Sequence, residues 1–266
     1  MDNITGKVAL ITGGATGIGA AYVKELFKRG MKAATLLDIH DNGKDLADEM
    51  NSCYGDNKAL FVKADVTNFE AFKGGFEANM KKFYQLDLVI NNAGIMRDRT
   101  WERMIDINIK GTITGSLLGI QYMGKNHGGC GGTIVNTASI VGLQPFVGAP
   151  VYTGTKHFII GFTRSMGTDF FYRLTGIRFL SVCPGLTKTQ IVPDIEQSVL
   201  GGFPNLAKIF AREVNSVIPQ SVERIAEGLN TMLNEGENGS IWVGENDEPI
   251  YEVVIPDRKT FKKERC

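Results

Sequence analysis

The stretch 7-KVALITGGATGIGAAYVKELFKRG-30 decides the fold of this chain. Its apolar run at 7–13 is typical of a strand that is buried on both faces. A glycine-rich turn follows at once, and residues 20–29 then carry apolar side chains at helical spacing. A strand, a glycine turn and a helix in this order indicate a site for the pyrophosphate of a dinucleotide, because the glycines allow close backbone approach and the helix N-terminus offers free N–H groups.

The alternation of strand and helix continues along the whole chain. Buried strands separated by helices imply right-handed crossovers and a parallel sheet. We therefore predict one α/β domain, residues 1–266, with a doubly wound Rossmann-type sheet of seven parallel strands. Further strands are expected at 32–38, 58–65, 86–94, 132–139, 177–185 and 240–245, and helices at 44–51, 69–83, 101–125, 151–174 and 221–233.

Composition argues against several classes of protein. The 266 residues are 43% apolar and 22% charged, with a formal net charge of zero, so no nucleic-acid partner is expected. The four cysteines match no zinc or redox spacing, and His127 with Cys130 gives too few ligands for a metal. The first residues lack a signal-peptide pattern, and no apolar run reaches membrane-spanning length. We expect a cytoplasmic protein without disulfides or membrane contact.

Residues at the predicted carboxyl ends of the strands form a candidate cofactor site, because these ends meet at one edge of a doubly wound sheet. Asp38 ends the second strand, where a carboxylate accepts the ribose hydroxyls of NAD and repels the additional phosphate of NADP. No Arg or Lys stands at Ala15, at Thr16 or just after Asp38 to bind that phosphate. The expected cofactor is therefore NAD. The residues expected to hold it here are Gly13, Thr16, Gly17, Ile18, Gly19, Asp38, Ile39, Asp65, Val66, Asn92, Ala93 and Gly94.

Tyr152 and Lys156 lie four residues apart on a predicted helix, so both side chains face the same side and both are expected to contact the cofactor. A nearby ammonium and an oxidised nicotinamide would each lower the pKa of a phenol from about 10. A phenolate can take the proton of an alcohol while a hydride leaves, and Ser139 can hold the alcohol oxygen. Tyr54 and Lys58 share this spacing in a turn-like segment and are a control for coincidence.

Several motifs follow one another between residues 6 and 190. They are Thr12-Gly13…Gly17-Ile18-Gly19, Asn91-Asn92-Ala93-Gly94, Ser139, Tyr152…Lys156 and Pro184-Gly185. In this order they resemble the short-chain dehydrogenase/reductase family. The resemblance implies that Asn108 completes a catalytic tetrad by holding a water that relays protons through the lysine. It also implies cofactor contacts from Pro184, Gly185, Thr187 and Thr189.

Longer stretches resemble two subfamilies that oxidise secondary alcohols with NAD. Residues 101–165 are similar to the 15-hydroxyprostaglandin dehydrogenases. The stretches PVYTGTK (150–156), CPGLTKT (183–189) and NGSIW (238–242) are similar to insect alcohol dehydrogenases of the fruit-fly type. The prostaglandin enzymes carry a substrate-contacting Gln three residues before their Tyr. This chain has Ala149 there, while Gln144 lies elsewhere in the same loop.

Residues 186–218, here called the covering segment, are expected to lie over the nicotinamide. Phe203, Leu206, Ile209 and Phe210 stand there at roughly helical spacing, which fits either a lid over an apolar alcohol or simple packing against the core. The loop before Tyr152 would form the opposite wall. The expected substrate contacts are Ser139, Gln144, Phe146, Ala149 and Tyr152.

These observations predict an NAD-dependent oxidoreductase that interconverts a lipophilic secondary alcohol and its ketone, with Tyr152 as general base. The identity of the alcohol and the physiological direction stay open. The alternatives are an NADPH-dependent carbonyl reductase, which Asp38 disfavours, and a non-catalytic NAD-binding scaffold, which the complete tetrad disfavours. Helices 101–125 and 151–174 carry apolar residues on more than one side and predict a homodimer or homotetramer. A C-terminal tail is expected at about 247–266, and its basic end, 257–266, is expected to be solvated.

Overall fold

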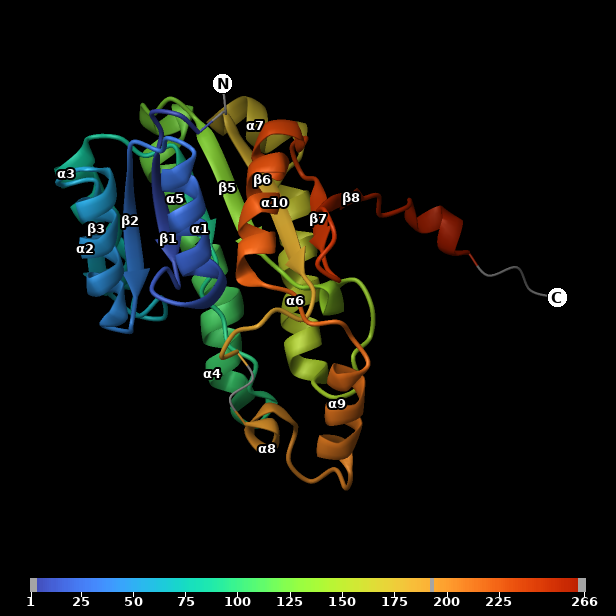
Figure 1. Ribbon diagram of the computed structural model, residues 1–266. Helices are drawn as coiled ribbons and strands as arrows, with labels where there is room; N and C mark the ends of the chain where they lie inside the picture. Colours follow the sequence, from blue (N-terminus) through green and yellow to red (C-terminus); the bar gives the residue numbers. More distant parts are fainter. Residues whose placement is uncertain (1–3, 192–193, 263–266) are drawn as a thin grey trace.

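Eight strands form one sheet in the order β3-β2-β1-β4-β5-β6-β7-β8 (Figure 1). The computed structural model describes residues 4–191 and 194–262. From β1 the chain moves outward to β3 and then crosses back to β4, which makes the β1–β4 boundary the switch point of a doubly wound sheet. The predicted Rossmann-type fold is confirmed. The strands are β1 (Val8–Thr12), β2 (Ala33–Asp38), β3 (Ala59–Lys63), β4 (Leu88–Asn91), β5 (Gly132–Thr137), β6 (Ile177–Pro184), β7 (Ile241–Gly244) and β8 (Tyr251–Val253).

Helices cover both faces of the sheet. On one face α1 packs against α10, and their apolar side chains join a core with Leu36 and Trp242. On the other face α3 and α5 contribute to a second core with Leu10 and Val89. The α-helices are α1 (Gly17–Lys28), α2 (Asn42–Tyr54), α3 (Phe69–Phe83), α4 (Trp101–Ile105), α5 (Thr112–Met123), α6 (Pro150–Met166), α7 (Asp169–Thr175), α8 (Ile195–Ser198), α9 (Leu206–Asn215) and α10 (Val222–Glu235).

The eighth strand corrects the predicted count of seven. β8 lies within the expected C-terminal tail, 247–266, and it pairs antiparallel with β7. Asn246 and Asp247, with φ of 56° and 60°, lie in left-handed conformations before it, which Asn and Asp adopt more readily than most residues. A strand of three residues, of which Tyr251 and Glu252 are exposed, shows no apolar pattern from which it could be predicted.

Two predicted helices are each divided. The stretch 101–125 contains α4, a π-helical turn η2 (Asp106–Gly111) and α5. The stretch 151–174 breaks at Gly167 and Thr168 into α6 and α7, because Thr168 is extended, with φ of −80° and ψ of 156°. The pattern of apolar residues continues across both breaks, so sequence periodicity does not show them.

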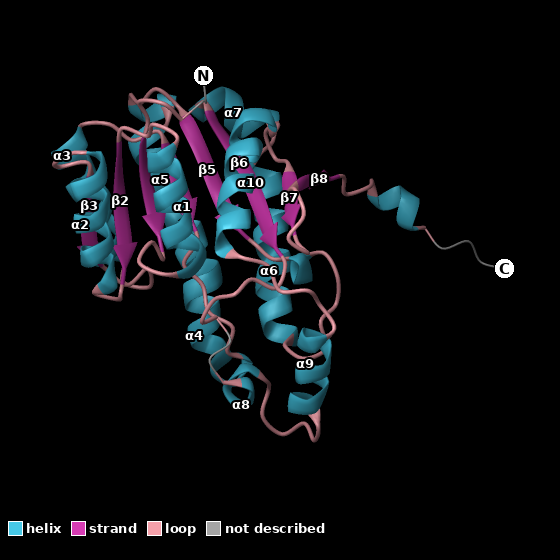
Figure 2. Cartoon of the chain, in the orientation of Figure 1, coloured by secondary structure: helices cyan, strands magenta, loops and turns pink. Residues whose placement is uncertain are grey.

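The carboxyl ends of the parallel strands face α4, α8 and α9. Figure 2 shows the arrows of β2 and β6 pointing toward the end of the molecule where these helices lie. Helices α8 and α9 belong to the covering segment, which therefore stands over the edge where the sequence places its site residues. The chain after β8 projects away from the sheet (Figure 1), and the last basic residues, Lys263 and Arg265, lie outside the described residues.

Candidate active site

The glycine turn between β1 and α1 is closely packed. Gly13 has a φ of 62°, and a Cβ there would lie 3.0 Å from the Cα of Ala93. At Gly19 a Cβ would lie 2.0 Å from the carbonyl oxygen of Gly13. Thr16, which precedes Gly17 and Ile18, gives no side-chain cap to α1, and the first turn carries no acidic residue. The N–H groups in the first turn of α1 are therefore available to a phosphate, and the glycine turn fits the pyrophosphate of a dinucleotide.

The residues after β4 hold this turn in place. The side-chain amide of Asn92 donates to the carbonyl oxygens of Thr12 at 3.2 Å and Gly13 at 3.3 Å. The hydroxyl of Thr12 accepts from the N–H groups of Asn92 at 2.9 Å and Ala93 at 3.0 Å. A Cβ at Gly94 would lie 3.3 Å from Oδ1 of Asn108. The expected cofactor residues Asn92, Ala93 and Gly94 thus connect the glycine turn to the tetrad.

Asp38 lies at the end of β2 and is 7% exposed. Its Oδ2 accepts from the N–H of Ala15 at 2.9 Å, and its Oδ1 accepts from the N–H of His40 at 3.0 Å. Each carboxylate oxygen has a second acceptor position, so a ribose hydroxyl can still bind. Asp38 therefore also shapes the glycine turn, through its contact with Ala15. The neighbouring Ile39 is exposed.

Asp65 has a partner that sequence reasoning did not find. It accepts hydrogen bonds from both the backbone and the hydroxyl of Thr67, and it forms an ion pair with Arg103 of α4. Partial burial raises the pKa of Asp65, but the hydrogen bonds from Thr67 and Arg103 outweigh it and hold that pKa below its usual value. Asp65 therefore ties α4 to the segment after β3, next to the buried Val66.

The segment after β6 crosses the glycine turn. Thr189 lies beside Gly17, where an added Cβ would stand 3.3 Å from Cγ2 of the threonine. The hydroxyl of Thr187 donates to the carbonyl of Gly185 at 2.9 Å, and Thr187 forms an isolated bridge with Gln220. Pro184 is the last residue of β6. The four residues implied by the family resemblance therefore run along one side of the expected cofactor site.

Tyr152 and Lys156 share one side of α6 and are both 3% exposed. Nζ of Lys156 lies 5.4 Å from the centroid of the Tyr152 ring and donates to the carbonyl of Thr137 at 2.9 Å. The side chain of Ser139, two residues after β5, lies close enough to the Tyr152 phenol to lower its pKa. The structure thus brings together the three residues to which the sequence assigns proton transfer.

The pKa of the Tyr152 phenol differs from the expectation. Burial raises this pKa above its usual value, and the nearby Ser139 hydroxyl opposes the rise. Burial also lowers the pKa of Lys156 to about 8. Desolvation penalises the charged forms of both side chains at these buried positions. The charge of an oxidised nicotinamide, when bound, would favour the phenolate.

Asn108 lies in the π-helical turn η2 and is 1% exposed. Its Oδ1 accepts from the N–H of Ile95 at 2.9 Å, and its amide donates to the carbonyl of Ile95 at 3.0 Å. The amide also reaches the hydroxyl of Thr155 on α6 at 3.2 Å. π-helical turns are frequent at functional sites. This one places Asn108 between the segment after β4 and the helix of Tyr152.

The expected substrate residues are only partly brought together. Ala149 and Tyr152 share a buried apolar cluster with Phe210 of α9, and Phe146 packs on it, with ring centroids of Phe146 and Phe210 5.4 Å apart. Gln144 is exposed and lies outside this cluster. In the covering segment, Phe210 is fully buried and Leu206 packs on the cluster. By contrast, Phe203 is 64% exposed, and Ile209 lies outside the cluster.

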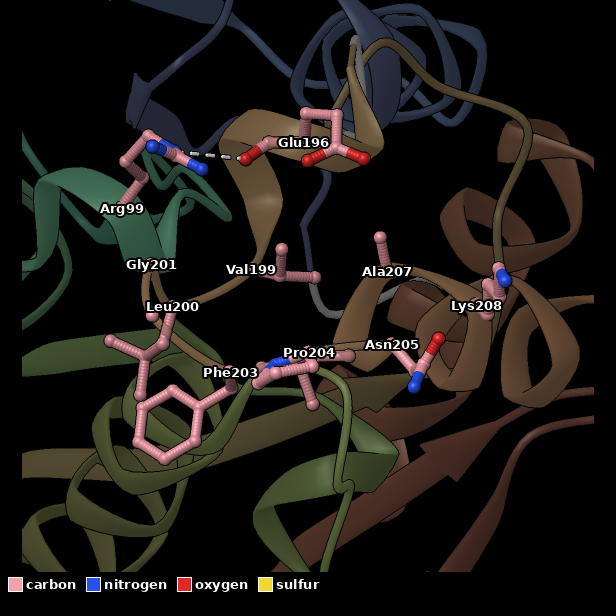
Figure 3. A pocket seen from close by; sticks show the side chains of 12 residues that line it. Arg99, Glu196, Val199, Leu200, Gly201, Phe203, Pro204, Asn205, Ala207 and Lys208 are labelled. Atoms are coloured by element: carbon pink, nitrogen blue, oxygen red, sulfur yellow. Dashed lines mark hydrogen bonds between the residues drawn. The ribbon is translucent and has the colours of Figure 1, made fainter.

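A cavity of about 480 Å³ lies next to this cluster (Figure 3). Figure 3 shows Arg99 on one side, where its Nε donates to the carbonyl of Glu196 at 3.1 Å. Lys208 stands on the other side. The cavity and the Tyr152 cluster share an apolar wall made of Val199, Leu206 and Ala207.

Two carboxylates bind backbone N–H groups at Tyr152 and in the loop before it, and the sequence did not predict either of them. Asp98, which begins the short turn η1 (Asp98–Thr100), accepts from the backbone N–H of Tyr152 at 2.9 Å. Glu213 of α9 accepts from the N–H of Gly148 at 2.9 Å. Both residues are more than 50 positions away from their partners in the chain. No motif or local spacing could have linked them.

The control pair does not form a site. Tyr54 ends α2 and stacks on Phe27, whereas Lys58 follows Gly55, beyond the helix.

Cys53 and Cys130 are exposed free thiols, Cys183 is a buried one, and Cys266 lies outside the described residues. Within residues 4–191 and 194–262, no group of three or more His, Cys, Asp or Glu could hold a metal. No helix of the described chain is long and apolar enough to cross a membrane.

Comparisons with known proteins agree with this geometry. The sequence matches the family of short chain dehydrogenases over residues 7–199. The 15-hydroxyprostaglandin dehydrogenase (NAD(+)) of Rattus norvegicus is 38% identical over 244 residues, which cover 90% of this chain and 91% of the relative. Alcohol dehydrogenase 2 of Ceratitis capitata is 31% identical over 240 residues, which cover 90% of this chain and 92% of the relative.

A solved structure shares the fold. The 3-ketoacyl-(acyl-carrier-protein) reductase from Brucella melitensis, complexed with NADH, superposes with a TM-score of 0.75 at 22% identity. The match covers 91% of this chain and 98% of that chain. From the family match and the identity to the rat relative, the chain belongs to the short chain dehydrogenase family.

Proposed function

We propose that this protein is an NAD-dependent oxidoreductase that interconverts a lipophilic secondary alcohol and its ketone. The observation that carries the proposal is the placement of Tyr152, Lys156, Ser139 and Asn108 at the carboxyl edge of the sheet, beside the glycine turn. A scaffold that only binds a dinucleotide has no need of a buried phenol, ammonium and hydroxyl at that edge.

The cofactor is NAD. When bound, it supplies the acceptor for a hydride from the alcohol carbon. The glycine turn and the first turn of α1 bind the pyrophosphate through backbone N–H groups. Asp38 accepts the adenosine ribose hydroxyls and repels a phosphate at that ribose. The names of the rat relative and the Brucella structure, which include NAD(+) and NADH, support this assignment.

The tetrad divides the proton transfer among its members. The Tyr152 phenolate takes the proton of the alcohol hydroxyl as general base. Ser139 holds the same oxygen through its hydroxyl and orients it toward the phenol. Lys156 favours the phenolate by its charge. Asn108 holds a water that passes the proton from the lysine side toward solvent.

The surroundings of the phenol favour an apolar substrate. Tyr152 belongs to a buried cluster with the apolar side chains of Met104, Val199 and Phe210. Each polar group of a polyol left unpaired against them would cost about 1–3 kcal/mol. An alkyl chain would instead gain roughly 25 cal/mol for each Å² of apolar surface buried. The relatives, named for a hydroxyprostaglandin and an alcohol, support an alcohol as the substrate class.

A panel of alcohols tests this function. NADH formation is followed by its absorbance with a homologous series of secondary alkanols, with cyclic secondary alcohols and with a polyol. We expect kcat/KM to rise with alkyl or ring size because each added group buries apolar surface. A polyol that is turned over more efficiently than every lipophilic alcohol would contradict the proposed substrate class.

A further inference from the structure

The helix that carries Tyr152 lacks a cap of its own. The N-cap position of α6 is Ala149, whose side chain makes no hydrogen bond. By contrast, α3 and α10 are capped by their own N-cap residues, Asn68 and Ser221. The first N–H groups of a helix have no partner within it, and when buried they need one elsewhere. In α6 the N–H group of the buried Tyr152 is one of these.

Asp98 supplies the missing acceptor from a distant part of the chain. Its Oδ2 accepts from the N–H of Val151 at 2.8 Å, and its Oδ1 accepts from the N–H of Tyr152 at 2.9 Å. The residue is 0% exposed, and no basic side chain of the described chain forms an ion pair with it. A carboxylate presents two acceptor oxygens, so it holds two successive N–H groups at once. A serine hydroxyl or an asparagine amide offers one acceptor oxygen.

The segment that contains Asp98 is itself fixed to the catalytic edge. Asn108 holds Ile95 by both its N–H, at 2.9 Å, and its carbonyl, at 3.0 Å. The same amide donates to the hydroxyl of Thr155 at 3.2 Å. Asp98 therefore holds α6 directly at Tyr152, and Asn108 links the same segment to Thr155, about one turn further along the helix. Two such contacts fix both the distance and the rotation of the helix.

We propose that Asp98 is a positioning residue for Tyr152: its buried carboxylate holds the first turn of α6 and so sets where the phenol stands relative to Ser139 and Lys156. The proposal rests on the proposed role of Tyr152 as the base. A misplacement of about 1 Å in a reacting group can cost about 100-fold in rate. Loss of the bidentate contact therefore acts on the rate of the chemical step rather than on binding.

The test compares Asp98→Asn, Asp98→Ala and wild type with NAD and a secondary alkanol that wild type oxidises. We expect kcat to fall about 10- to 100-fold, while KM and the dissociation constant of NADH stay within about threefold. The pH profile of kcat/KM should shift to higher pH, because a displaced phenol loses the stabilisation that favours its phenolate. If Asp98→Asn or Asp98→Ala fails to bind NADH, Asp98→Ser, which keeps one acceptor oxygen, is measured in its place.

Ser221→Ala is the matched control, because it removes the cap of α10, a helix that carries none of the four tetrad residues. We expect it to lower the thermal midpoint without changing kcat or the pH profile. If Asp98→Asn lowers only the thermal midpoint, with wild-type kcat and pH profile, Asp98 is a structural cap and the proposal is wrong. Tyr152→Phe, measured alongside, separates the two claims. If it stays active, the proposed function fails; if it is inactive while Asp98→Asn is unaffected, only the positioning role fails.

Discussion

The ammonium group of Lys156 donates a hydrogen bond of 2.9 Å to the carbonyl oxygen of Thr137, the last residue of β5. This bond joins α6 to the sheet beneath the Tyr152 ring. In the described part of the chain no carboxylate pairs with Lys156. The Thr137 carbonyl and the face of the Tyr152 ring are the groups that stabilise its charge. Burial therefore lowers the pKa of Lys156 to about 8.

The lowered pKa of Lys156 predicts a pH dependence of stability. Between about pH 8 and pH 10.5 the unfolded chain keeps this lysine protonated, while the folded chain has largely released the proton. The unfolded state then binds more protons, so this residue makes the free energy of unfolding rise with pH in that window. Urea titrations should show this rise for wild type relative to Lys156→Met. The exposed control Lys44→Met should track wild type, and a flat or falling difference for Lys156→Met would refute the prediction.

Asp38 predicts the cofactor preference. We expect kcat/KM with NAD to exceed that with NADP by at least about tenfold, which corresponds to about 1.4 kcal/mol. Asp38→Ser removes the charge that repels the phosphate, so the preference should narrow. It also removes the acceptor for the N–H of Ala15, so the efficiency with NAD should fall. Both cofactors are compared with one alcohol, and an equal or reversed preference in wild type would show that Asp38 does not select NAD.

The hydrogen bonds between Glu213 and the loop before Tyr152 predict that the covering segment controls access of the alcohol to the site. The Glu213 carboxylate accepts from the N–H groups of Gly148 at 2.9 Å and Val147 at 3.3 Å, and Phe210 packs beside Gly148. Glu213→Gln weakens these bonds, so KM for the alcohol should rise about 2- to 10-fold. NADH binding should stay unchanged, and Arg212→Gln, one residue earlier on α9, should leave KM as it is. An unaltered KM in Glu213→Gln would contradict this role.

The predicted oligomer depends on apolar side chains that the single chain does not cover. Leu117 on α5 is 55% exposed, and Phe158 and Phe162 on α6 stack with centroids 5.7 Å apart while remaining partly exposed. We expect light scattering at micromolar concentration to give the mass of a dimer or tetramer. Leu117→Glu should lower that mass, because it places a charge in the proposed interface. A monomeric mass for wild type would overturn the prediction.

Much of the fold could be predicted because its determinants are local in the sequence. β1 and β2 are buried along their whole length, and such strands appear as continuous apolar runs. The tight turn at Gly13 requires glycine, and its position between strand and helix reveals it. By contrast, β8 is short and half-exposed, and the π-helical turn that carries Asn108 continues the helical pattern around it.

The residues of the candidate active site likewise include some that the sequence pattern predicts and others that only the fold brings together. Tyr152 and Lys156 are one helical turn apart, so their spacing shows that they meet. Asp98, Glu213 and the Arg103–Asp65 pair act across 38 to 65 positions of sequence, where only the fold decides which residues meet. The burial that raises the pKa of Tyr152 depends likewise on side chains from several distant segments.

The most direct test of the account is the turnover of Tyr152→Phe with NAD and a lipophilic secondary alcohol, measured with NADH binding on the same preparation. The variant keeps the ring but lacks the oxygen that takes the proton, which typically contributes about 10² to 10⁴ in rate. We predict a loss of kcat of that size with NADH affinity preserved, and wild-type kcat for Tyr54→Phe. Wild-type turnover by Tyr152→Phe would contradict the assignment of Tyr152 as the base.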